Sequence, residues 1–392
     1  MRIAVSAVVN NLRHTNFTGK FSGANTYFPS TENFMRLQKI VRIFLCAALL
    51  TPPVAAFETD QYNLPPVPLA DIGAEVSEYA EQNLRKAVDK INNEIVFRQK
   101  CVENKAAKQK KLKCGSPDEE RAKLDYLRSE EAVAREVYNL LGAGTIPFTK
   151  SGNWMESHQF KNQPARYKTG YWKSIFAVLP TDYLTISSTV NIYNSQFGTD
   201  KIAHFFQQGY DYYKIYNRAL REKSTPAEAT KKAVRYGRKT ENTYFGTLVS
   251  GVFSNADLHS NFVGMKFYQG LTREIKIGDT TRPAVLILKN GSWTFNANVD
   301  LPEILIKPFV SSHLNEALNP SLFIKGLRSF ARRTVRKQSC GQWFNQFPNL
   351  SQSELNETQR ALKLWHGEDY GFKESKNFVT ISNTCFDTNG EK

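Results

Sequence analysis

The region from Gly198 to Gly264 most constrains how this chain can fold, because two of its segments carry an apolar and a polar pattern at helical spacing. Apolar side chains recur at three- and four-residue steps from Ile202 to Leu220, so this segment should be a helix with one face in the core. Asp200 and His204 stand one turn apart on the opposite face. The simplest interpretation of such a polar stripe is a solvent-exposed face.

A second polar stripe follows Ser254 and carries Asp257, Asn261 and Gly264 on one helical face. A glycine within a polar stripe removes side-chain bulk, so another backbone can approach closely at that position. Two solvent-exposed stripes would not need this glycine. We therefore expect the two polar faces to lie against each other, with Gly264 at the close approach of the two helices.

Glu241 lies between these segments and is interpreted differently. Thr225 should cap a short helix that ends before Gly237, and Thr240 should cap the next helix. Glu241 would then stand in the first turn of that helix, at the head of an apolar stripe, where a carboxylate favours the helix dipole. If this carboxylate is buried, its pKa would rise and it could take part in proton transfer.

The region as a whole contains three short motifs in one order. They are Asp200-Lys201-x-x-His204-Phe205, Glu241, and Asp257-x3-Asn261-x2-Gly264. This order resembles the motif of VanZ-like proteins and of related predicted periplasmic proteins of unknown function. The resemblance covers residues 198–264 and implies a cell-envelope context, with a link to glycopeptide resistance in the member that names the family. VanZ-like proteins carry the motif on membrane-spanning helices, whereas the charged residues between 211 and 222 make this helix too polar to span a bilayer.

Two functional hypotheses follow from these acid, imidazole and amide groups. In the preferred one, the protein is a non-catalytic envelope protein that binds lipid, glycan or a partner, and the polar groups form a satisfied network. In the alternative, it is an envelope hydrolase acting on a phosphate-bearing lipid or a wall glycan. The candidate catalytic residues are His204, Asp200, Glu241, Asp257 and Asn261.

In that hydrolase, His204 would be the general base or acid, oriented by Asp200 or Asp257, and Glu241 would be a second carboxylate. A form of the site with a divalent metal would use His204 and two carboxylates as ligands and keep one position open for water. No cofactor is established by the sequence.

Other motifs do not add to this region. Metalloprotease, nucleophile-elbow and nucleotide-binding motifs are absent from the sequence. Two further clusters, His313-Leu314-Asn315-Glu316 and His366-Gly367-Glu368-Asp369, are isolated along the chain, and we interpret each as structural or exposed.

An export signal is expected at residues 35–56. Three basic residues precede an apolar run at 43–50, and small residues ending at Ala56 follow it. This order is typical of a secretory signal peptide, so the mature chain should begin near Phe57 and be periplasmic or secreted. A buried helix is the alternative interpretation. Residues 1–34 would be a mis-assigned or disordered leader.

The charge of the mature chain bears on its partners. Cleavage after Ala56 removes six of 52 Lys and Arg and one of 37 Asp and Glu, so the formal net charge falls from +15 to +10. A basic exported protein should meet anionic envelope components, such as a lipid head group or a wall polymer. Nucleic acid is disfavoured because no recognised binding motif accompanies the charge. No apolar run reaches the ~20 residues of a transmembrane helix, so none is expected in the mature chain.

Four cysteines remain in the mature chain: Cys101, Cys114, Cys340 and Cys385. An even number in an exported chain indicates two disulfides. The sequence permits three connectivities, of which we favour the local one, Cys101–Cys114 with Cys340–Cys385. A zinc site is the alternative, but the chain has no CxxC pair to support it.

The first part of the mature chain, residues 57–144, should be a helical hairpin held by Cys101–Cys114. A proline-rich lead-in precedes a helix over about 71–109. A second helix should begin after Ser116 and continue to about Leu141, because Ser116, the next proline and Glu119 complete a capping box.

The remaining sequence predicts a central helical domain at 145–338 and a loop-rich tail at 339–392. A β-hairpin is expected at about 283–297, since Asn290-Gly291 between apolar runs favours a tight turn. A helix over 319–337 carries a basic stripe, which is either a solvated face or a contact for a membrane or polyanion. The fold class is therefore mainly α, an irregular helical bundle with one β-hairpin.

Overall fold

The structure is a computed structural model, and all of the residues that it describes belong to one compact unit within 54–392. The described ranges are 58–103, 114–144, 148–177, 186–243, 246–248 and 250–386. The expected leader and signal peptide, residues 1–56, lie outside them. Among the described residues, no helix has the length and apolar character needed to cross a membrane.

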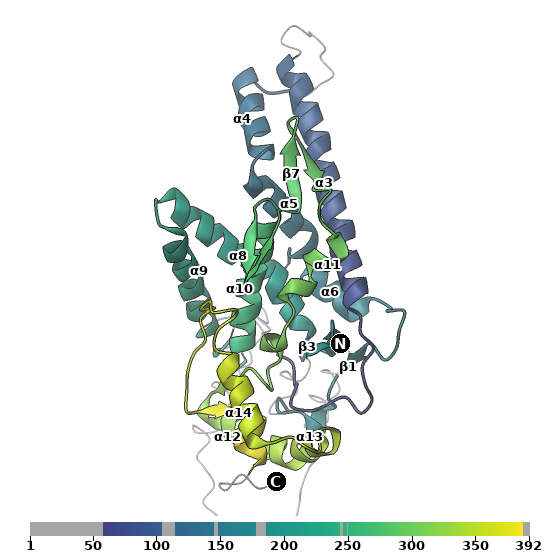
Figure 1. The fold of residues 1–392 in the computed structure, drawn as a ribbon, viewed down its shortest axis with the longest axis vertical. Helices are drawn as coiled ribbons and strands as arrows, with labels where there is room; N and C mark the ends of the chain where they lie inside the picture. The colour runs from purple at the N-terminus through teal and green to yellow at the C-terminus, as the bar shows by residue number, and fades with distance from the viewer. Residues whose placement is uncertain are drawn as a thin grey trace, which may run out of the picture. The chain divides into compact units, whose positions relative to one another are not determined.

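Two helices at the centre of the fold carry the polar stripes. They are α8, Thr199–Arg221, and α10, Asn255–Gly270, which pack along each other (Figure 1). Their backbones meet at Gly209 and Gly264, where a methyl group on Gly209 would lie only 2.6 Å from the Cα of Gly264. The expectation that the stripes face each other, with Gly264 at the close approach, is confirmed.

Hydrogen bonds between side chains and backbone fix the register of α8 against α10. The hydroxyl of Tyr268 donates to the carbonyl of Phe206 at 2.7 Å, and that of Ser260 donates to the carbonyl of Lys201 at 2.6 Å. Every residue from 199 to 206 is buried. The solvent-face interpretation of Asp200 and His204 is therefore wrong, because α8 begins inside the protein with neighbours on all sides.

Helix α9, Pro226–Glu241, packs against α8. It differs from the sequence prediction in two ways. It continues through Gly237, where the ring and hydroxyl of Tyr212 occupy the space that a side chain would need, so this glycine serves close packing and does not end the helix. Thr240 does not cap a helix, since its hydroxyl donates to the carbonyl of Gly237. Glu241 is consequently the last residue of α9 and not the first acid of a new helix.

The helical hairpin forms as expected, with one difference. Its helices are α3, Gly73–Glu103, α4, Pro117–Leu127, and α5, Glu130–Leu141, and the Cys101–Cys114 disulfide is present. The capping box at Ser116 is confirmed. The predicted single helix to Leu141 is interrupted because Ser129 accepts a hydrogen bond from the amide of Ala132 and caps a separate helix.

The β-hairpin at Asn290-Gly291 is confirmed. Strands β7, Leu286–Lys289, and β8, Ser292–Phe295, pair in antiparallel register around a turn whose φ angles are 51° and 79°. The structure adds further short antiparallel strands. These are β1, Arg166–Tyr167, β2, Thr189–Ile192, β3, Ser195–Gly198, β4, Val252–Phe253, β5, Ile275–Ile277, β6, Thr280–Arg282, β9, Ser321–Phe323, and β10, Phe378–Val379. The fold is mainly helical, but the expectation of a single hairpin is too low.

The C-terminal part differs from the expected helix over 319–337. Strand β9 pairs with β4 and β10, so α12 begins only at Lys325 and runs to Thr334. A π-helical turn at Val335–Ser339 then leads into α13, Cys340–Gln346. The Cys340–Cys385 disulfide joins α13 to α15, Ile381–Cys385.

The other short elements lie on connections between these helices. They are α6, Lys150–Ser157, η1, Tyr171–Lys173, α11, Leu301–Leu305, η2, Lys307–Phe309, η3, Ser312–Leu314, and α14, Gln352–Ala361. Two segments outside the helices carry residues of the site described below. One is the segment after residue 57, and the other follows η3.

Substitution of Gly264 by alanine should destabilise the protein by roughly 1–3 kcal/mol, because the new methyl group would press on the carbonyl of Phe205 and the Cα of Gly209. Urea unfolding would measure the loss. Gly326→Ala is the matched control, since its added methyl group would meet nothing within 4 Å outside its own stretch of helix, and alanine favours a helix. Equal stability of the two variants would contradict a close approach at Gly264.

Candidate functional site

The centre of the site is the fully buried ammonium group of Lys201. Its Nζ atom lies 2.5 Å from Asp200 Oδ2, 2.5 Å from Asp257 Oδ1 and 2.6 Å from Glu316 Oε1. Burial alone lowers the pKa of this ammonium, but the three carboxylates outweigh burial and raise it well above its usual value. The lysine is therefore held as a cation inside the protein.

The carboxylates around Lys201 come from three separate elements. Asp200 lies in the first turn of α8 and Asp257 in the first turn of α10, where the positive end of a helix dipole favours an acid. The amide of Asp257 donates to the Oγ of Ser254, the cap of α10. Glu316 follows the short helix η3. Lys201 thus connects the starts of two helices with a distant turn.

Neutral groups complete the contacts of these acids. Thr59 donates its hydroxyl to Asp200 Oδ1 at 2.6 Å, and Ser254 donates its hydroxyl to Glu316 Oε1 at 3.0 Å. The backbone amide of Glu316 donates to the side-chain oxygen of Gln61. Residues 59–61 therefore contact the cluster twice, at Asp200 and at the backbone of Glu316.

His204 lies one turn after Asp200 and contacts an acid and an amide of α10. Its Nε2 is 3.4 Å from Asp257 Oδ2, and its Nδ1 is 3.1 Å from Asn261 Oδ1. The structure thus brings together His204, Asp257 and Asn261 of the candidate catalytic residues. Asp200 reaches the same acid only through Lys201.

Glu241 is buried beside the cluster but does not contact its imidazole. One carboxylate oxygen accepts a hydrogen bond from the amide of Ser254 at 2.9 Å. Burial and then the nearby negative charge of Asp257 raise the pKa of Glu241 well above its usual value. The prediction that burial would raise this pKa is confirmed, although the expected place of Glu241 at a helix start is wrong.

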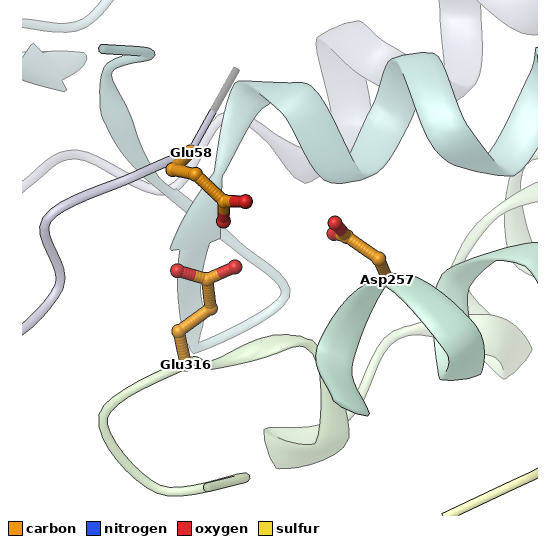
Figure 2. Close-up of side chains that lie close together, drawn as sticks. All are labelled: Glu58, Asp257 and Glu316. Carbon is orange, nitrogen blue, oxygen red and sulfur yellow. The ribbon is translucent and has the colours of Figure 1, made fainter. Parts of the chain in front are cut away.

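Glu58 completes the cluster from the segment before α3. It is only 3% exposed, and neither of its carboxylate oxygens has a hydrogen-bond partner among the described residues. Figure 2 shows its carboxylate directed towards those of Glu316 and Asp257. Oxygens from the three carboxylates lie within 4.8 Å of one another, which is a spacing that could hold a metal ion.

The cluster carries far more acid than base. Its carboxylates belong to Glu58, Asp200, Glu241, Asp257 and Glu316. One lysine cannot neutralise them, and an isolated buried carboxylate is costly in free energy. Burial raises the pKa of Glu316 to about 7 despite the opposing effect of Lys201, and burial also raises that of Glu58. The cluster therefore retains protons near neutral pH or requires another cation.

Three members of this cluster were not predicted as site residues from the sequence. Lys201 stood within the motif, but its position gives no sign that it faces three acids. Glu316 belongs to a cluster that was interpreted as isolated, although the structure places it on Lys201. Glu58 lies in the proline-rich lead-in, which carries no pattern that marks a site.

Comparisons of this chain with protein-family models, with curated proteins and with solved structures find no match. The functional conclusion therefore depends on the geometry of the cluster.

Replacement of Lys201 by methionine should lower the free energy of unfolding by about 3–5 kcal/mol, because it leaves buried carboxylates without their cation. Chemical denaturation would measure the change. Lys214→Met is the control: this lysine pairs with Asp211 at the surface, and we expect a loss below about 1 kcal/mol. A stable Lys201→Met protein would show that the acids are already neutral without the lysine.

The raised pKa of Glu316 predicts a pH-dependent stability. Its stabilising contribution should be complete below the unfolded pKa near 4.5 and should disappear as the pH rises through about 7. The stability of the unaltered protein relative to Glu316→Gln should then fall by roughly 3 kcal/mol between these limits. Denaturation at a series of pH values tests this. The exposed Glu303→Gln should leave the profile unchanged, and a flat difference for Glu316→Gln would contradict the prediction.

Proposed function

We propose that this protein is a non-catalytic, exported cation-binding protein, in which Glu58, Asp257 and Glu316 bind one divalent cation. The observation that carries the proposal is the carboxylate of Glu58, which is buried, has no hydrogen-bond partner among the described residues and is directed at the other two acids (Figure 2). A buried carboxylate in this position is stabilised by a positive ligand.

The chemistry of the ligands favours a hard cation. Carboxylate oxygens suit Ca²⁺, Mg²⁺ and Mn²⁺, whereas softer metals favour thiolates. The four cysteines of residues 58–386 are all in disulfides. Lys201 contacts only Oε1 of Glu316, so the second oxygen of that carboxylate can face the cation.

A cation at this position would join three parts of the chain that are distant in sequence. Glu58 belongs to the segment before α3, Asp257 to α10, and Glu316 to the turn after η3. The proposed role of the cation is thus to stabilise the centre of the fold by joining these three segments. The motif residues 200, 204, 257 and 261 surround this cation position.

Burial of the cluster supports binding over hydrolysis. The side chains of Lys201, His204, Asp257 and Glu316 are at most 3% exposed. A hydrolase would need a path by which substrate and water reach His204. The two disulfides suit an oxidising compartment, which agrees with the proposed export to the periplasm or beyond.

An anionic envelope component is part of the proposal as a partner. Helix α12 and the turn after it carry Arg328, Arg332 and Arg336 one turn apart. None of these arginines forms an ion pair with an acid among the described residues. Burial, and then its two arginine neighbours, lower the pKa of Arg332. An anion at this stripe would relieve the repulsion.

The metal-stripped, full-length exported protein should bind one Ca²⁺, Mg²⁺ or Mn²⁺ ion per chain, measured by calorimetry with each chloride salt and by elemental analysis. Glu58→Gln should weaken binding at least about tenfold, because it removes the unpartnered carboxylate. Binding should strengthen from pH 5 to 8, since the ion displaces protons from carboxyls whose pKa values are raised.

Glu120→Gln is the matched control for this experiment. Glu120 is also a buried acid, but Arg98 and Lys123 already pair with it in the helical hairpin. Its replacement should leave cation affinity unchanged. Absence of stoichiometric binding of all three ions, or equal affinity in Glu58→Gln, would overturn the proposed function.

A further inference from the structure

A separate cavity of about 640 Å³ lies between the segment before α3 and helix α13. Small-molecule sites typically have volumes of about 300–1,000 Å³ and combine apolar walls with a few polar groups. One wall is the turn from Leu64 to Pro68, and Tyr167 and Lys173 belong to another. This cavity shares no lining residue with the buried acid cluster.

The opposite wall carries three amide side chains from one face of α13. Gln342, Asn345 and Gln346 are spaced three and four residues apart, so they lie on the same side of the helix. Gln342 accepts a hydrogen bond from the amide of Leu64 at 3.0 Å. Asn345 and Gln346 are exposed, and their amides make no hydrogen bond to the described residues. Each amide offers both donors and an acceptor to a ligand.

The walls are held in place before any ligand arrives. The indole of Trp343 donates to the carbonyl of Tyr62 at 2.9 Å, which ties α13 to the opposite wall. The side chain of Asn63 donates to the carbonyl of Lys173 at 3.0 Å, which ties the third wall to the same segment. The Cys340–Cys385 disulfide fixes the start of α13. Such rigid walls reduce the ordering cost of binding.

The residue before the lining residue Lys173 is an exposed tryptophan. Trp172 precedes the lining residue Lys173 in η1 and is 86% exposed, the largest value among the exposed apolar side chains of the described residues. Its ring meets that of Tyr171 edge-on at 4.7 Å. A flat, exposed aromatic face one residue away from the cavity lining is suited to the apolar face of a sugar ring that extends out of the cavity.

The charge of the lining selects among ligand classes. Lys173 is the one charged side chain among the residues that line the cavity. A phosphate-rich polymer or a lipid surface would require several cations. The amides and the single cation instead match hydroxyl and acetamido groups, and the ring of Tyr167 matches the apolar face of a sugar.

We propose that this cavity binds a carbohydrate chain. The amides of α13 hydrogen-bond to the hydroxyl or acetamido groups of the sugars, and the apolar faces of the rings pack on Tyr167 and Trp172. The ligand class is a neutral or weakly acidic glycan of a few sugar units. The cation proposed above plays no part in this binding.

The full-length exported protein should be titrated with two probes, the tetrasaccharide of N-acetylglucosamine and that of β-1,4-linked glucose. Calorimetry and tryptophan fluorescence should show saturable binding of at least one of them. Trp172→Ala and the double variant Asn345→Ala/Gln346→Ala should each raise its Kd at least about tenfold. Trp172→Phe should retain most of the affinity because it keeps an aromatic face.

Phe148→Ala is the matched control, since it removes an aromatic side chain that is 63% exposed and is neither a lining residue nor next to one in the chain. It should bind the tetrasaccharide like the unaltered protein. Circular dichroism would show that each variant is folded. Failure to bind either probe at about 10 mM would overturn the proposal, as would binding that Trp172→Ala and the double variant leave unchanged. Binding that physiological salt abolishes would also overturn it, because it would reflect attraction of charge alone.

Discussion

The contact between the Lys201 ammonium and three buried carboxylates is the interaction on which the rest of the structure depends. Charges in a protein interior are tolerated only when they are paired with good geometry. Lys201 meets this condition by drawing together the first turns of α8 and α10 and the turn that carries Glu316. The glycines at 209 and 264 then let the two helices approach closely enough to maintain the pairing.

Features set by neighbours in the sequence could be predicted. The capping box at Ser116 and the turn at Asn290-Gly291 depend on a few adjacent residues, and both are present in the structure. The facing of α8 and α10 was also predictable, because a glycine within a polar stripe indicates that another backbone packs closely there. The contact of His204 with Asp257 and Asn261 follows directly from that facing.

Features that depend on distant partners could not be predicted. Gly237 lies inside a helix and makes room for Tyr212, and no local pattern reveals this neighbour. Residues 321–323 form a strand because β4 and β10 lie on either side of it. The membership of Glu58 and Glu316 in the site has the same origin. From the sequence alone, the carboxylate of Glu58 in the proline-rich segment is expected to be exposed to solvent, because the residues that bury it lie far away in the chain.

The burial of the segment that begins at Glu58 has a consequence for the order of folding. Each residue from 58 to 64 is buried, yet its partners come from much later in the chain. Gln61 accepts from the amide of Glu316, and Tyr62 donates to the carbonyl of Val379, 317 residues further on. Contacts of such separation form slowly, because a long loop must close first. This segment is synthesised before its partners, so it cannot make its final contacts until the chain has been made as far as Val379.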